Sequence, residues 1–118
     1  MSVPVEQIAS AVGELLDANR ETRASLEASD AVLAHGLDVL NSGGDVVSIL
    51  RTIPVATYRK TTQDNSDRIN LARHRLRVLV IASCVDSGLT PREIAVAWGL
   101  SRQRVDQFLQ EYRKSPHD

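Results

Sequence analysis

Apolar residues recur at steps of three and four along the N-terminal third of the chain, which is the spacing of one face of an α-helix. The first members of this stripe are Val5, Ile8, Val12 and Leu15. The same register continues to Leu40, but polar or small residues occupy its middle. The stripe fits one long helix in a two-stranded coiled coil, with Asn19 in its seam, or two helices over 4–27 and 30–41 folded back as a hairpin. Because the middle of the seam is weak, we favour two helices packed in a bundle.

The middle of the chain has one clear break and two further predicted helices. The Asn-Ser-Gly-Gly run at 41–44 ends the first part. A short buried helix over 46–53 follows and stops before Pro54, since the residue before a proline disfavours helical geometry. The polar run 61–65 is typical of a loop or a frayed helix end. The next helix is predicted at 67–87, and its second half is apolar on nearly all sides, which indicates a buried central helix.

The strongest local signals begin at Thr90. Thr90 and Glu93 have the spacing of a capping box, in which each side chain accepts a hydrogen bond from the other residue's backbone N–H. Pro91 suits the first helical position, where its missing N–H costs nothing. Gly99 suits a left-handed stop at the C-terminal end. A helix is therefore predicted over 91–98.

A second helix is predicted directly after this stop. Ser101 is a favourable N-cap, and the helix it starts extends over 102–113. No segment alternates between apolar and polar residues as a half-buried strand would. The predicted fold class is therefore all-α, a helical bundle with a C-terminal three-helix unit formed by 67–87, 91–98 and 102–113.

This C-terminal pattern resembles the bacterial helix-turn-helix when Pro91 is taken as the first position of the motif. Small Ala95 then falls where the two helices touch. Apolar residues fall at the buried positions of the motif: Ile94, Trp98, Leu100, Val105 and Phe108. Within that family, residues 101–108 are similar to the recognition helix of region four of bacterial sigma factors, which usually has a basic or neutral residue where this chain has Asp106. The resemblance covers residues 88–113 and implies DNA binding in the major groove.

Charge is distributed unevenly along the 118 residues, although the formal net charge is only −1. Residues 1–58 hold three basic against eight acidic side chains, a net charge of −5. Residues 59–118 hold eleven basic against seven acidic side chains, a net charge of +4. We therefore predict an acidic helical segment, 1–58, for oligomerisation or partner binding, and a basic helix-turn-helix DNA-binding segment, 59–118.

Several other classes of protein are disfavoured by the composition. A single cysteine, Cys84, excludes an internal disulfide and suits a reducing cytoplasm. No apolar stretch reaches the length of a membrane span, and we expect a cytoplasmic, nucleoid-associated protein. The three histidines are far apart in sequence and have no ligand partners at metal-site spacing. With no nucleophile constellation or phosphate-binding loop, we expect no enzyme, no metal and no cofactor.

Candidate DNA contacts follow from the faces of the last helix and from nearby cations. Side chains that point away from its apolar face are predicted to contact base edges: Ser101, Arg102, Gln103, Asp106 and Gln107. Neighbouring cations and a helix N-terminus are predicted to bind phosphates: Arg73, Arg77, Thr90, Arg92 and Arg104. A solvated surface would also be polar, but two arginines and two glutamines on it favour contact with bases.

These observations predict a bacterial, sequence-specific, DNA-binding transcriptional regulator. We expect a homodimer on double-stranded DNA, held together by the N-terminal helical segment, because one recognition helix contacts only a few base pairs. One alternative is a protein–protein interaction module that binds a subunit of the transcription apparatus. Another is a DNA-organising or partition protein of low sequence specificity.

Overall fold

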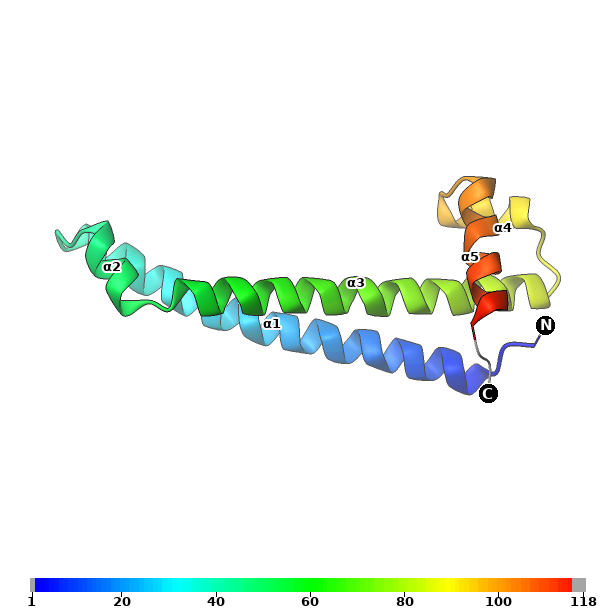
Figure 1. Ribbon diagram of the computed structural model, residues 1–118, viewed down its shortest axis with the longest axis horizontal. Coiled ribbons are helices and arrows are strands. Elements are labelled where there is room, and N and C mark those ends of the chain that lie inside the picture. The colour runs from blue at the N-terminus through cyan, green and yellow to red at the C-terminus, as the bar shows by residue number, and fades with distance from the viewer. Residues whose placement is uncertain (1, 116–118) are drawn as a thin grey trace. The chain divides into compact units, whose positions relative to one another are not determined.

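The computed structural model describes residues 2–115, and over this range it contains five α-helices and no strand (Figure 1). The helices are α1 (Val5–Asn41), α2 (Val46–Thr52), α3 (Val55–Asp86), α4 (Pro91–Trp98) and α5 (Arg102–Lys114). The all-α prediction is confirmed. None of these helices combines the length and the hydropathy that crossing a bilayer requires.

The described residues form two compact units. The terminal unit comprises residues 2–15 and 71–115, and the hairpin unit is Leu16–Asn70. The division of function between 1–58 and 59–118 stays a prediction.

The favoured pair of N-terminal helices, 4–27 and 30–41, is wrong, because α1 is one continuous helix of 37 residues. The polar and small residues in the middle of the stripe have modest helix propensities, and none of them is a proline that would stop the helix. Gly36 is buried, and a Cβ placed on it would lie 3.9 Å from Cγ2 of Ile49 in α2. Helix α2 therefore packs against α1 at Gly36, at a distance that would also accommodate a methyl group.

The predicted loop at 61–65 is also wrong, and so is the helix start at residue 67. Helix α3 begins at Val55 and continues through the polar run without a break. Tertiary contact supports this segment, because the Asn65 side-chain amide donates to the Ser25 hydroxyl of α1 over 2.8 Å. A polar residue of this run therefore lies in a helix and contacts α1, whereas the sequence alone suggested a loop.

Helix α2 has the predicted caps but not the predicted burial. The Asp45 carboxylate accepts from the Ser48 backbone N–H over 2.8 Å, and Ile53 ends the helix in extended geometry before Pro54. No residue of α2 is buried, and Val46 and Leu50 are more than half exposed. The prediction of a buried helix fails because the hairpin unit places no third layer of helices over it.

Helices α1 and α3 lie antiparallel within each unit. In the hairpin unit Arg68 pairs with Glu21, and Asn65 bonds Ser25, so positions on α1 fall as positions on α3 rise. In the terminal unit the Arg75 guanidinium lies 2.8 Å from a carboxylate oxygen of Glu14.

The hydrophobic core lies in the terminal unit. It joins the last turns of α3 to α4, to one face of α5 and to the start of the chain at Val3 and Ala11. The largest side chains below 2% exposure are Phe108, Ile81, Ile94 and Val105. This core holds α4 and α5 against the end of α3, and so it fixes which face of α5 meets solvent.

Candidate nucleic-acid interface

Helix α4 starts with the predicted capping box. The Thr90 hydroxyl oxygen accepts from the Glu93 backbone N–H over 3.2 Å, and the Glu93 carboxylate accepts from the Thr90 backbone N–H over 3.1 Å. The Thr90 hydroxyl also donates to the Glu93 carboxylate over 3.0 Å. Thr90 is therefore engaged in the cap, and a phosphate would have to displace Glu93 from its hydroxyl.

A tight turn joins α4 to α5. Gly99 adopts φ 65° and ψ 34°, the left-handed region in which glycine has no Cβ penalty, and this stops α4 as predicted. The Leu100 backbone N–H donates to the Ala95 carbonyl over 2.9 Å. The Ser101 hydroxyl then accepts from the Arg104 backbone N–H over 3.1 Å and caps α5. The end of α4 and the start of α5 are thus separated by three residues, and Ala95 of α4 is buried.

Helix α5 has one buried and one exposed face. Its buried side chains are Val105, Phe108, Leu109 and Tyr112. The opposite face exposes the residues predicted to contact bases, and the structure brings them together over the cap and first two turns of the helix: Ser101, Arg102, Gln103, Asp106 and Gln107. The N-terminal half of α5 therefore presents a continuous polar surface to solvent.

Two of the predicted phosphate ligands contact the aromatic ring of Phe108 instead of standing free. The Arg104 guanidinium carbon lies 4.4 Å from the ring centroid, and that of Arg77 lies 5.7 Å from it. Arg104 also donates to the side-chain oxygen of Gln107 over 3.0 Å. This bond fixes the Gln107 amide, leaving its N–H₂ group to donate outward. The three-residue spacing of Arg104 and Gln107 on one helix could have predicted this hydrogen bond.

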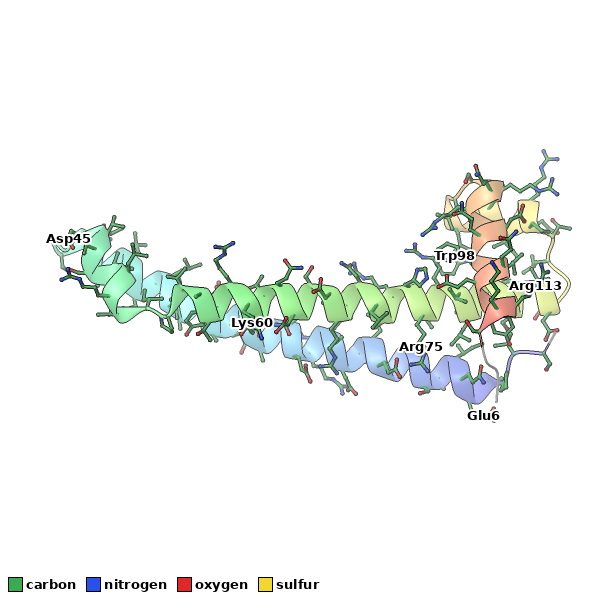
Figure 2. All side chains as sticks on the ribbon, viewed as in Figure 1. Glu6, Asp45, Lys60, Arg75, Trp98 and Arg113 are labelled. Atoms are coloured by element: carbon green, nitrogen blue, oxygen red, sulfur yellow. The ribbon has the colours of Figure 1, made fainter. Side chains whose placement is uncertain are left out.

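Trp98 is not buried as the sequence predicted. Its side chain is 38% exposed, at the last residue of α4 (Figure 2). The Arg77 guanidinium carbon lies 5.9 Å from the indole centroid, which is within the range of a cation–π contact. A tryptophan is rarely buried completely because of its size, and here a cation of α3 lies over its ring.

The remaining predicted cations differ in their partners. Within residues 2–115, Arg73, Arg92 and Arg102 form no ion pair, and all three are exposed. Arg92 projects from the first turn of α4, where the backbone N–H groups also favour an anion. These three side chains are available to phosphates or bases without breaking an existing contact.

His74 belongs to this cluster in a way that sequence reasoning missed. Its Nε2 atom lies 2.7 Å from a carboxylate oxygen of Glu111, and its ring centroid is 5.4 Å from that of Phe108. The two partners are separated by 37 positions in sequence, so no local pattern could reveal the pair. Glu111 thereby holds the histidine against the ring that Arg77 and Arg104 also contact.

Comparisons with protein-family models, curated proteins and solved structures found no match. Within the described residues, no group of three His, Cys, Asp or Glu side chains is placed to hold a metal ion. Function is therefore inferred from the surface of α4 and α5 and from its neighbouring cations.

Proposed function

We propose that this chain is a sequence-specific DNA-binding transcriptional regulator in which α4, the turn at Gly99 and α5 form a helix-turn-helix with α3. The observation that carries the proposal is the exposed polar face of α5 at its N-terminal end, next to a buried helix crossing at Ala95. In a helix-turn-helix, this end of the second helix enters the major groove. The likeness of the sequence to bacterial motifs supports a role on bacterial DNA in the cytoplasm.

The exposed face of α5 has side chains suited to different base edges. Arg102 can donate two parallel hydrogen bonds to O6 and N7 of guanine, and Gln103 can bond N6 and N7 of adenine. Asp106 can accept from N4 of cytosine. The bond from Arg104 occupies the Gln107 side-chain oxygen and leaves its N–H₂ group to donate outward, so we assign Gln107 to an acceptor such as O4 of thymine. Ser101 caps the helix that carries these groups.

Phosphate contacts orient such a helix without selecting sequence. The unpaired, exposed side chains of Arg73 and Arg92 suit this role best. Arg77 and Arg104 contribute positive charge from their positions over Phe108, and Thr90 starts the helix whose N-terminal N–H groups face the phosphate beside Arg92. Since one recognition helix contacts only a few base pairs, the regulator would act as a homodimer on two half-sites about 34 Å apart.

One observation favours a second candidate function, a protein–protein interaction module of the transcription apparatus. Val96 of α4 is 79% exposed, and Trp98, on nearly the opposite side of the same helix, is 38% exposed. Either apolar side chain could contact another protein in place of DNA.

Selection of bound sequences from a random pool of duplex DNA distinguishes the two functions. The wild-type chain is expected to enrich a palindromic motif. A variant with Arg102→Ala and Gln103→Ala should lose that enrichment. The matched control, Arg113→Ala with Lys114→Ala, removes as many polar side chains from the other end of α5 and should keep it (Figure 2 marks Arg113).

Each result of this selection favours a different function. No retention of DNA by the wild-type chain would refute the proposal and favour the protein-binding module. Weak enrichment that both variants reduce equally would indicate a DNA-organising protein of low specificity.

A further inference from the structure

The hairpin unit has almost no hydrophobic core of its own. Between Leu16 and Asn70 only Ala18 and Gly36 are buried, and no leucine, isoleucine or valine is. Nine large aliphatic side chains of this unit are exposed, by fractions from 39% at Val55 to 68% at Leu33. Because burial of apolar surface is the main force that holds helices together, two helices with so little buried need a further partner.

The exposed leucines of α1 form a heptad pattern, here called the α1 seam: Leu16, Leu26, Leu33, Leu37 and Leu40. Steps of seven from Leu16 reach positions 23, 30 and 37. Steps of seven from Asn19, three residues further on, reach Leu26, Leu33 and Leu40. These are the a and d positions of a coiled coil. Leu33 and Leu40 lie beside Gly36, which faces α2, yet all five leucines of the seam remain 46–68% exposed, so neither α2 nor α3 covers the seam.

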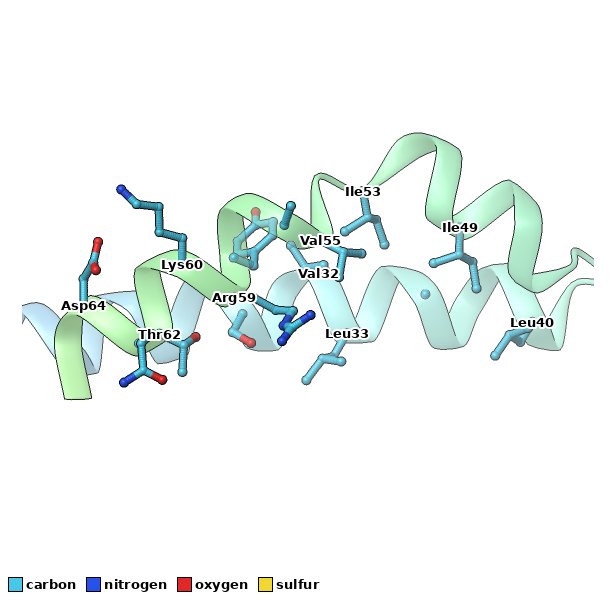
Figure 3. Close-up of a pocket in the computed structure, with 15 residues that line it drawn as sticks. Val32, Leu33, Leu40, Ile49, Ile53, Val55, Arg59, Lys60, Thr62 and Asp64 are labelled. Carbon is cyan, nitrogen blue, oxygen red and sulfur yellow. The ribbon is translucent and has the colours of Figure 1, made fainter. Parts of the chain in front are cut away.

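The seam continues into an apolar groove between α1, α2 and α3 (Figure 3). Leu33 and Leu40 line this groove from α1, Ile49 and Ile53 line it from α2, and Val55 lines it from the start of α3. Its volume is about 940 Å³. The hairpin unit therefore offers one ridge of leucines together with a hollow that side chains of a partner could fill.

We propose that a second copy of this chain covers the α1 seam, with the two α1 helices antiparallel. The proposal deepens the proposed function, which requires a dimer, by naming the surface that forms it. The sequence stripe that begins at Val5 is divided in the structure, since Ile8 packs on the core of the terminal unit while the leucines from Leu16 onward remain exposed.

Charge complementarity identifies the occupant as the same chain. Arg23 and Asp30 occupy the two charged positions of the series that contains Leu16 and Leu37, and neither forms an ion pair within the described residues. A parallel dimer would oppose Arg23 to Arg23 and Asp30 to Asp30. In an antiparallel dimer the a positions of one copy face the d positions of the other, and a centre near residue 28 lays Leu16 opposite Leu40. Each Arg23 then lies within one helical turn of the Asp30 of the other copy, and two-fold symmetry makes this contact twice.

The exposed seam supplies about half of the area that such an interface needs. Burying a leucine completely removes on the order of 100 Å² of apolar surface. The five half-exposed leucines of the seam therefore supply roughly 550 Å² from two copies, and the groove beside them and their polar neighbours supply the rest. Specific interfaces bury at least about 1,000 Å² in total, and those of permanent dimers are the more apolar ones.

Light scattering with the full-length chain and a matched pair of variants tests the interface. At tens of micromolar the wild-type protein should have about twice the 12.9 kDa mass of one chain. Leu33→Glu should raise the dimer dissociation constant by more than about tenfold, because it places a charge in the apolar seam. Leu71→Glu is the control, since Leu71 is 71% exposed on α3 outside the seam and should leave the dimer unchanged. Both substitutions keep a good helix former.

Charge reversal tests the antiparallel arrangement. Arg23→Glu and Asp30→Lys should each weaken the dimer, and the double variant should regain wild-type association. In a parallel dimer each single reversal would replace one like-charge contact by another, so unchanged dissociation constants for both would overturn the antiparallel arrangement. A monomeric wild-type chain, or a Leu33→Glu variant as dimeric as wild type, would overturn the interface itself. These measurements contain no DNA, so a dimer that selects no DNA refutes the proposed function alone.

Discussion

Replacing Phe108 tests whether the core of the terminal unit is what fixes α5. Phe108 is 1% exposed, and truncating such a side chain to alanine costs about 3–5 kcal/mol through lost transfer energy and the cavity left behind. The guanidinium groups of Arg104 and Arg77 lie 4.4 and 5.7 Å from the ring centroid, and each such contact adds about 0.5–1 kcal/mol. Phe108→Ala should therefore lower the free energy of unfolding by about 4–7 kcal/mol, a large fraction of the stability of a small domain.

Phe108→Leu separates the ring contacts from the packing. Leucine keeps most of the apolar volume but offers no π face to Arg77 or Arg104, so the expected loss is only about 1–3 kcal/mol. Urea unfolding can be followed by helical circular dichroism and by the fluorescence of Trp98, the single tryptophan of the chain. Leu71→Ala, at a side chain 71% exposed in the same unit, should change stability by less than about 0.5 kcal/mol.

A Phe108→Ala variant within about 1 kcal/mol of wild type would refute this assignment of the core. Equal losses for alanine and leucine would show that the cations over the ring, and not its volume, account for its contribution.

Three further predictions concern the helix crossing, a phosphate contact and a helix cap. Ala95→Leu should overpack the buried contact of α4 with α5, cost about 1–3 kcal/mol in thermal unfolding and abolish DNA binding; unchanged melting would mean that the crossing lies elsewhere. Arg92→Ala should weaken binding to all DNA sequences alike and reduce the slope of log affinity against log salt by about one; a sequence-dependent loss would contradict a phosphate contact. Hydrogen bonds from the Ser48 N–H and hydroxyl lower the pKa of Asp45 from 3.8, so its stabilisation is present at neutral pH and lost as acid protonates it. Acid unfolding of Asp45→Ala, followed by circular dichroism, should show a smaller loss of stability below about pH 4 than wild type, and an identical profile would contradict this.

Features set by residues close in sequence were predictable. The Thr90–Glu93 capping box, the left-handed stop at Gly99 and the Ser101 cap are each confirmed, because every one depends on partners within a few positions. They fix the bounds of α4 as predicted and those of α5 to within one residue. The exposed side of α5 followed from the same periodicity, whereas its contacts with bases remain predictions.

Features set by distant contacts were not predictable. The polar run before Asn65 is helical because α1 lies beside it, whereas the low helix propensity of these residues alone suggested a loop. Trp98 is 38% exposed at the end of α4, and a cation from a distant part of the sequence, Arg77 of α3, lies over its ring. Likewise, His74 contacts Glu111 across the terminal unit, a pairing without any local signal. In each case tertiary context decided what propensity and apolar spacing left open.

The central claim is that α5 selects bases, and single-base specificity at Arg102 tests it most directly. Wild type, Arg102→Ala and the control Arg113→Ala are each titrated with the selected duplex and with duplexes changed at one base pair. We predict that Arg102→Ala costs about 1–3 kcal/mol on the selected duplex and removes discrimination at one guanine position only, while Arg113→Ala retains it. If Arg102→Ala weakens every duplex equally and keeps discrimination at all positions, α5 does not read the sequence through Arg102 and the account is contradicted.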